Sequence, residues 1–344
     1  MSPENISSGT PNLPISPCSF PRVPAQSKHY LRLKKTFLAR ITAAGLVFSL
    51  SILILPFCIA GDQAGYREVY DSLRYLNIKE GFLFYSAKLD SLEFVHFFLT
   101  WLASRVVGKD LFIAFSNAIL AYVAMSLFQK WKASIIIAFL IILTNYYFFA
   151  VYFTAERLKF GFIFLFLSMI YIDQIKRSYK FAVLALISHV QVAIVYVSLL
   201  FNFFVKQLLK LFRTAKISKA VLLIPLVFIP LFLIKDQILA KFQFYYKDTR
   251  ALIELVRILL FFLLAFWYSM KKKETLIIFI PIFIAVFLVG GDRVNIFGYF
   301  VFLYYGLQIR RGWNFGVLAT SLYFTYSSIG FLINVFQRGD GFLQ

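Results

Sequence analysis

The sequence predicts an all-α protein, a polytopic transmembrane helical bundle of about eleven helices, within a range of about ten to twelve. Hydrophobic residues make up 60% of the 344 residues and charged residues only 15%, against about 45–50% and about 25% in soluble domains. A soluble chain could not cover its surface with so few charges, so soluble, fibrous and disordered proteins are excluded. The apolar runs show no alternation of the β-barrel kind, which indicates helices.

The N-terminal region differs in composition from the rest. Most of the prolines lie in residues 1–24, and basic residues follow. We expect residues 1–37 to form a disordered, proline-rich, basic cytoplasmic tail. The first apolar run, 38–60, is long enough to span a bilayer and longer than the core of a signal peptide, which predicts an uncleaved first helix. Residues 38–344 then form the membrane domain.

Further apolar runs follow, separated by charged residues. The expected spans are 91–107, 111–128, 133–153, 158–175, 181–205, 220–234, 251–270, 275–290, 294–309 and 316–336. Two connections, 61–90 and 235–250, are rich in aromatic and charged residues, which suits contact with carbohydrate or phosphate. Ordinary solvated loops with interfacial tyrosines would have the same composition.

The net charge of +20 is explained better by basic loops that set topology and touch anionic lipid than by nucleic-acid binding. The basic tail and the run Lys271-Lys272-Lys273 favour a cytoplasmic N-terminus. With eleven spans, this orientation puts connections 61–90 and 235–250 outside and Arg157 inside.

Several ionisable residues lie within or beside the expected spans, where charge is costly and often functional. Glu93 and His96 are one turn apart and could share a proton, although Glu93 could equally be an interfacial acid. His189 lies about 12 Å into its run at 1.5 Å per residue. The alternative for His189 is a buried ring bonded to a neighbouring helix.

Two arginine-rich segments also stand out. The first is a stripe of opposite charges along one helix face, formed by Arg250, Glu254 and Arg257. These charges neutralise one another, which is typical of a structural role. Arg293 follows Gly290-Gly291-Asp292 and opens a helix, where a guanidinium beside free N–H groups favours phosphate. A plain turn with an interfacial arginine is the other interpretation.

Motifs of nucleotide- and metal-dependent enzymes are absent. The sequence has no Walker A, G-x-S-x-G, H-E-x-x-H, G-x-G-x-x-G or D-x-D pattern. Cys18 and Cys58 indicate neither a zinc site nor a disulfide framework. We expect no metal and no cofactor, so a substrate for this protein has to carry its own leaving group.

The order of features resembles the EpsG/Wzy-like family of polysaccharide polymerases over most of residues 41–310. The residues that carry this resemblance are Gly61-Asp62, Tyr66, Tyr70, Glu93-Phe94, Val107-Gly108, Arg157, Ser188-His189, Arg293 and Tyr299. The resemblance implies a bacterial inner-membrane enzyme that joins oligosaccharide repeat units, linked to undecaprenyl pyrophosphate, into O-antigen, capsule or exopolysaccharide at the outer face. Its partners would be the lipid-linked oligosaccharide, membrane lipid, and chain-length regulator and flippase proteins, with no nucleic acid.

The resemblance also implies roles for particular residues. Asp62, Glu93 or His189 would be the catalytic base. The residues expected to bind pyrophosphate or glycan are Arg293, Arg157, Arg67, Arg74, Arg250 and Tyr66. The inner position that charge counting gives Arg157 conflicts with this role, unless a segment between 91 and 157 is re-entrant or Arg157 is structural.

Two other functions remain open at this point. A flippase or other transporter for lipid-linked oligosaccharide would use the same arginines without chemistry. A membrane acyltransferase that modifies sugars would use His189 or His96 as its base. Flippases often have two related halves, which this sequence does not show. Such acyltransferases have a catalytic histidine early in the chain beside a cationic pair, and the first span here has no histidine.

Overall fold

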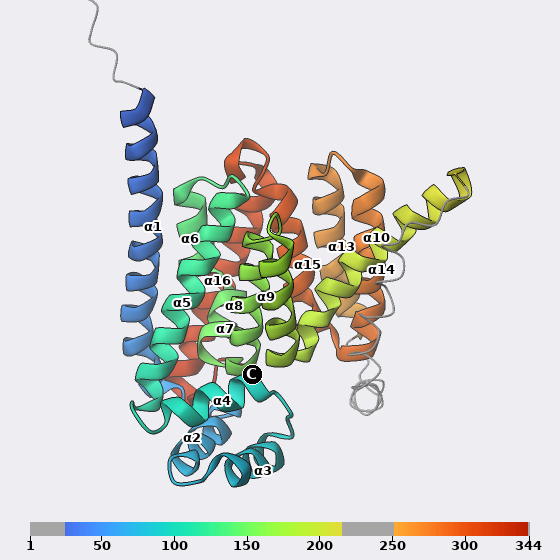
Figure 1. Cartoon of the computed structure of the whole chain (residues 1–344). Coiled ribbons are helices and arrows are strands. Elements are labelled where there is room, and N and C mark those ends of the chain that lie inside the picture. The colour runs from blue at the N-terminus through green and yellow to red at the C-terminus, as the bar shows by residue number, and fades with distance from the viewer. Residues whose placement is uncertain (1–24, 215–250, 343–344) are drawn as a thin grey trace, which may run out of the picture.

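The computed structural model describes residues 25–214 and 251–342, and every regular element in these ranges is a helix. Long helices pack side by side as a bundle, and three short helices lie across one end of it (Figure 1). The α-helices are α1 Ala25–Ile54, α2 Asp62–Leu73, α3 Ile78–Leu89, α4 Phe94–Ala103, α5 Lys109–Lys130, α6 Ile135–Thr144, α7 Tyr146–Phe153, α8 Glu156–Ile170, α9 Ile175–Ser188, α10 Ala193–Thr214, α13 Ala251–Tyr268, α14 Lys272–Val289, α15 Gly291–Gly306 and α16 Phe315–Arg338.

Four helical segments are long and apolar enough to cross a membrane: Lys35–Phe57, Lys109–Lys130, Val190–Lys210 and Arg310–Arg338. A fifth is added if α6 and α7, bent by 52° at Asn145, count as one span. An all-helical bundle with apolar spans indicates a membrane protein. The described residues do not support eleven such spans, because α4, α8 and α9 have only 10, 15 and 14 residues.

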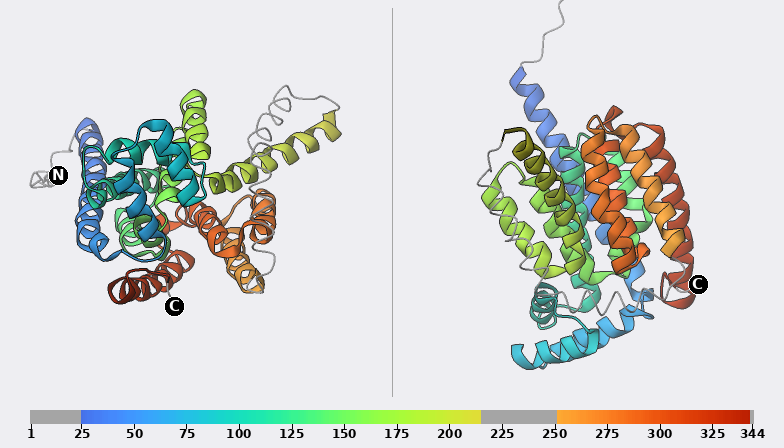
Figure 2. Two further views of the ribbon diagram at one scale, coloured as in Figure 1. Left: turned by 90° about the horizontal axis from the view of Figure 1, so that it is seen from below. Right: turned by 90° about the vertical axis from the view of Figure 1, so that its right-hand side faces the viewer.

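The connection 61–90, expected as a loop, consists largely of helices. We call α2, α3 and α4 the platform, and the end of the bundle that they cover the platform end (Figure 2). Val69, Leu73, Tyr85 and Phe97 form a small core of their own between these three helices. The apolar run 91–107 therefore belongs to the platform and does not cross the bundle.

A second difference lies in the run 181–205, which was expected to be one span. The helix is broken at His189, whose backbone is extended (φ −160°, ψ 118°), and a short 3-10 turn Val190–Val192 leads into α10. Helix α9 runs to the platform end, and α10 leaves from that same end (Figure 1). Gly161 of α8 allows the close approach, because a Cβ there would lie 2.9 Å from the Cβ of His189.

The first of these differences corrects the position of Arg157. Charge counting put Arg157 at the opposite end from Asp62 and Glu93, because it counted 91–107 as a crossing. Because α4 does not cross, α5 starts at the platform end, the α6–α7 pair returns to it, and Arg157 at the start of α8 lies there too. The connection before α5 therefore needs no re-entrant segment to bring Arg157 to the end where Asp62 and Glu93 lie.

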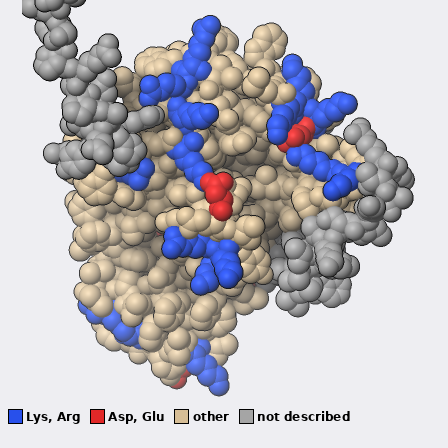
Figure 3. Space-filling view, turned by 45° about the horizontal axis from the view of Figure 1, so that its top comes forward, with Lys and Arg blue, Asp and Glu red and all other residues tan. Residues whose placement is uncertain are grey.

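The other end of the described bundle carries mostly basic residues, and we call it the basic end. The charged residues in its connections are Lys130, Lys132, Asp173, Lys176, Arg177, Lys180, Lys271, Lys272, Lys273, Glu274, Arg310 and Arg311. Figure 3 shows lysine and arginine side chains spread over the surface that faces the viewer, with few acidic ones among them.

Some expectations lie outside the described residues: the proline-rich segment 1–24, the run 220–234 and the loop 235–250. Helix α1 begins at Ala25, so residues 25–37, which the sequence assigned to the tail, form its first turns. The remaining runs 251–270, 275–290, 294–309 and 316–336 each coincide with one helix, α13 to α16.

Candidate functional site

A cavity of about 1410 Å³ opens among α2, α7, α8, the α9–α10 break, α13 and α16. Its polar lining includes Asp62, Tyr66, Arg157, His189, Gln191, Glu254 and Arg257. Aromatic side chains line much of the remainder, among them Tyr147, Phe261, Phe324 and Phe331. A large concave space with a few convergent polar groups is the usual form of a ligand site.

One cluster beside the cavity joins four segments that are separated in the sequence. His189 Nδ1 is hydrogen-bonded to Glu93 Oε1. Glu93 Oε2 lies 3.3 Å from Arg157 Nε and accepts a hydrogen bond of 2.9 Å from the Ser91 hydroxyl. Arg157 Nε also donates to the hydroxyl oxygen of Tyr66 at 3.0 Å. The structure thus brings together four of the residues that the sequence singled out.

Glu93 supports this cluster from behind, since it does not belong to the cavity lining. It precedes α4, outside the candidate membrane spans. Burial tends to raise the pKa of Glu93, but the charge and hydrogen bond of His189, together with the Arg157 guanidinium, lower it to about 2. Glu93 is therefore ionised at neutral pH and orients His189 and Arg157 as a fixed negative group.

The expected pairing of Glu93 with His96 is not found. His96 Nδ1 shares a hydrogen bond of 2.8 Å with the Tyr85 hydroxyl, inside the platform. Burial lowers the pKa of His96 to about 4, so its ring is neutral at pH 7. The platform turns these two side chains, one helical turn apart in sequence, toward different partners.

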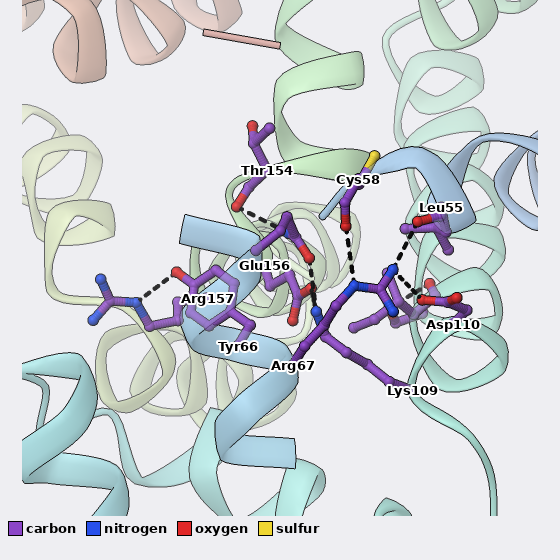
Figure 4. A network of polar contacts seen from close by, with 12 residues as sticks. Leu55, Cys58, Tyr66, Arg67, Lys109, Asp110, Thr154, Glu156 and Arg157 are labelled. Atoms are coloured by element: carbon purple, nitrogen blue, oxygen red, sulfur yellow. Dashed lines mark hydrogen bonds and ion pairs between the residues drawn. The ribbon is translucent and has the colours of Figure 1, made fainter. Parts of the chain in front are cut away.

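A second charged network lies next to the cavity, and none of its charged side chains belongs to the cavity lining. Lys109 Nζ lies 2.9 Å from Glu156 Oε1 and donates to Gln63 Oε1 at 2.7 Å. The Gln63 amide donates to the carbonyl of Thr154 at 3.5 Å, and Lys159 Nζ donates to Ser116 Oγ at 3.2 Å. This network, which we call the sealed network, ties α2, α5 and α8 together (Figure 4).

Arg67 has a structural position. Its guanidinium donates to the carbonyls of Cys58 at 3.0 Å and Leu55 at 2.8 Å, and pairs with Asp110 at 2.8 Å (Figure 4). It fastens the end of the first span to α5 and is not part of the cavity lining. The structure therefore separates Arg67 from the cluster in which the sequence placed it.

The other expected site residues have different outcomes. Asp62, in the first turn of α2, lines the cavity. Arg74 is exposed and lines a separate pocket of about 180 Å³ with Asp71 and Tyr75. Arg293 lies in the first turn of α15, where only its backbone is described, and Arg250 lies outside the described residues.

The sequence interpretation missed three cavity residues. Glu254 and Arg257 line the wall formed by α13, although their stripe was read as structural. Arg257 lies 3.3 Å from Glu254 Oε1, and the Asn295 amide donates to Glu254 Oε2. Gln191 follows His189 by two residues. Charge within an apolar run was the available signal for the pair in α13, whereas nothing in the sequence marked Gln191.

In the part of the chain that the structure describes, no three His, Cys, Asp or Glu side chains are grouped so that they could hold a metal ion. The donors that face the cavity are guanidinium, imidazole, amide and phenol groups, which suit an anionic or hydroxyl-rich ligand.

Comparison of the chain with protein-family models, with curated proteins and with solved structures finds no match, so the family resemblance stays a hypothesis.

Proposed function

We propose that this protein is a polysaccharide polymerase that joins undecaprenyl-pyrophosphate-linked oligosaccharide units within the cavity. The observation that carries the proposal is the convergence of Asp62, Tyr66, Arg157 and His189 on one cavity wall, with Glu254 and Arg257 on the wall formed by α13. Arginine is well suited to a pyrophosphate, because its planar fork makes paired hydrogen bonds with phosphate oxygens.

The proposed orientation puts the basic end in the cytoplasm and the platform end outside. Connections with many Lys and Arg residues stay on the cytoplasmic side, and the basic end has that composition. With this orientation the cavity wall formed by Asp62, Tyr66, Arg157 and His189 lies toward the outer side, where lipid-linked units are joined. The proposal also includes α8, α9, α13, α14 and α15 as further membrane-crossing helices beside the four or five long apolar segments.

In the proposed reaction, a hydroxyl oxygen of the acceptor sugar attacks the anomeric carbon of the donor. The bond from that carbon to the lipid pyrophosphate breaks, and the pyrophosphate leaves with the bonding electron pair. Asp62 is the base that takes the hydroxyl proton. Glu93 is less suitable because its pKa is about 2. His189 is less suitable because both ring nitrogens are already bonded, to Glu93 and Gln191.

Arg157 and His189 stabilise the negative charge that develops on the leaving pyrophosphate. Tyr66 holds Arg157 in place through its hydroxyl group. The aromatic surface of Phe261, Phe324 and Phe331 suits the polyprenyl tail or the faces of sugar rings. No nucleotide and no metal is needed, because the substrate carries its own leaving group.

The test is polymer formation by purified protein in lipid nanodiscs supplied with lipid-linked repeat units. Asp62→Asn should lower the rate by about a hundredfold while the protein still binds the units. A matched control is Asp71→Asn in the platform, outside the cavity lining, which should leave the rate unchanged. Transfer of units between leaflets by wild-type protein, without polymer, would instead establish a flippase.

A further inference from the structure

The break between α9 and α10 fixes the position of Gln191. His189 and Gln191 lie on the same short turn, two residues apart, and both line the cavity. Gly161 of α8 packs against this turn so closely that a Cβ would meet His189 and Val192 at 2.9 and 2.8 Å. The turn is therefore held against α8, and the side chains of His189 and Gln191 have little freedom to move.

One half of the Gln191 amide has a partner. Glu93 is ionised and accepts from His189 Nδ1. The second ring nitrogen, Nε2, lies 3.0 Å from Gln191 Oε1, with the amide oxygen as the acceptor. Glu93 and Gln191 thus hold the imidazole from both sides, and Glu93 also pairs with Arg157.

The other half of the Gln191 amide, its N–H₂ group, has no hydrogen-bond partner among the described residues. Gln191 is only 5% exposed. A buried amide donor without a partner is unfavourable, and native proteins rarely leave one unless a ligand or water completes it. Because Gln191 belongs to the cavity lining, its unpartnered amide nitrogen lies directly beside the space for a ligand.

We propose that the Gln191 amide N–H₂ donates a hydrogen bond to a phosphate oxygen of the substrate, beside His189 and Arg157. This assignment rests on the proposed function. The Arg157 guanidinium in the same cluster favours a phosphate oxygen over a sugar hydroxyl. The Gln191 amide also links the ligand to His189, which charge alone cannot do. Its N–H₂ group donates to the ligand, and its oxygen contacts the His189 ring.

The test uses the full-length protein in lipid nanodiscs and farnesyl pyrophosphate as the probe, with binding measured by calorimetry. Gln191→Met removes the donor without adding charge, and Gln191→Glu keeps an oxygen toward His189 but replaces the donor. Both variants should bind farnesyl pyrophosphate about tenfold more weakly, or worse, than wild type. Farnesol, which lacks the phosphates, should bind wild type and both variants equally.

Thr100→Val is the matched control, because the Thr100 hydroxyl is also buried without a partner among the described residues but lies in the platform, outside the cavity lining. Its affinity should equal that of wild type. Affinity within twofold of wild type in either Gln191 variant overturns the role of the amide and leaves the polymerase proposal intact. Failure of the wild-type protein both to bind the probe and to form polymer overturns both.

Discussion

Glu156 and Arg157 are neighbours in the chain, yet they belong to two charged regions with different surroundings. Glu156 pairs with Lys109 in the sealed network, where the two side chains are only 3% and 7% exposed. Arg157 pairs with Glu93 at the cavity, where the side chains are 21% and 12% exposed. Both regions pair a carboxylate with a cation, and both include a residue from the first two turns of α8.

The difference separates two uses of buried charge. In the sealed network no charged side chain belongs to the lining of the large cavity, and the network connects helices. At the cavity, Glu93 holds Arg157 and His189 from behind while their other faces remain on the lining. A buried ion pair is by itself weak support for function, and access to a cavity distinguishes the second region from the first.

The largest expected effect comes from breaking the sealed network. Glu156→Ala leaves Lys109 and Lys159 buried without their negative neighbour and should lower the free energy of unfolding by about 3–5 kcal/mol. Thermal unfolding in detergent measures this loss. The double variant Lys109→Met/Glu156→Leu should recover part of it, because it also removes the Lys109 charge and leaves only Lys159 without a negative neighbour. A Glu156→Ala protein as stable as wild type would contradict the structural role.

The next effect is on activity. Arg157→Ala should lower the rate of polymer formation by about a hundredfold, as expected for loss of one charge-assisted contact in the transition state. Arg157→Lys should restore it only in part, because an ammonium group cannot reproduce the fork geometry. The measurement is chain length and yield at equal protein amounts.

Arg67 provides the comparison for Arg157, since it is also an arginine with buried contacts but has no access to the cavity. Arg67→Lys should lower the unfolding temperature and leave the rate per folded molecule unchanged. A larger loss of rate in Arg67→Lys than in Arg157→Lys would reverse the assignment of the two regions.

A smaller effect concerns pH. The pKa of Glu93 is lowered from 4.5 to about 2 in the folded protein, so its interactions stabilise the fold above pH 4.5 and are lost as pH falls toward 2. Wild type should lose on the order of 2 kcal/mol across this window through Glu93. Glu93→Gln should show a flatter pH dependence there, measured by unfolding between pH 2 and 6. Parallel curves for the two proteins would contradict the ionised state of Glu93.

The smallest effect is expected at an exposed pair in the platform. Lys88 and Glu68 lie 2.7 Å apart, but their side chains are 40% and 53% exposed. Lys88→Ala should change the free energy of unfolding by less than about 0.5 kcal/mol, since water screens such pairs. The same unfolding assay applies, and a loss as large as that of Glu156→Ala would mean that burial does not explain the difference.

Much of the helical fold could be predicted from composition, because apolar runs such as 111–128 have only one stable form in a membrane. The lengths of the crossing segments could not be predicted in the same way. The run 91–107 is as apolar as a short span, but α4 packs on Tyr85 and Val69 of the platform. The break at His189 depends on Gly161 in another helix, a contact that hydropathy cannot show.

The candidate site was also predictable only in part, because residue type is visible in the sequence and three-dimensional contacts are not. Asp62, Tyr66, Arg157 and His189 were identified by residue type and order, and the fold brings them to one cavity. Arg67 was expected in the site but lies outside the cavity lining. Its guanidinium binds the backbone carbonyls of Cys58 and Leu55, and the positions of charged residues in the sequence do not reveal such contacts. Gln191 was missed because its importance comes from one unpaired amide group, which only three-dimensional packing reveals.

The turn at His189 has a practical consequence for mapping this protein with reporter fusions. With the membrane-crossing helices proposed above, counting 91–107 as a crossing adds one pass and counting 181–205 as a single pass omits one, so the two errors cancel after residue 188. Fusions at residues 80 and 272 therefore give the same answer for the arrangement expected from the sequence and for the observed one. Only fusions between about 108 and 188, for example at Lys132 and Gln174, distinguish the two, and the observed fold puts both on the side of residue 272. A sparse map could agree at every tested point while the middle of the chain was inverted.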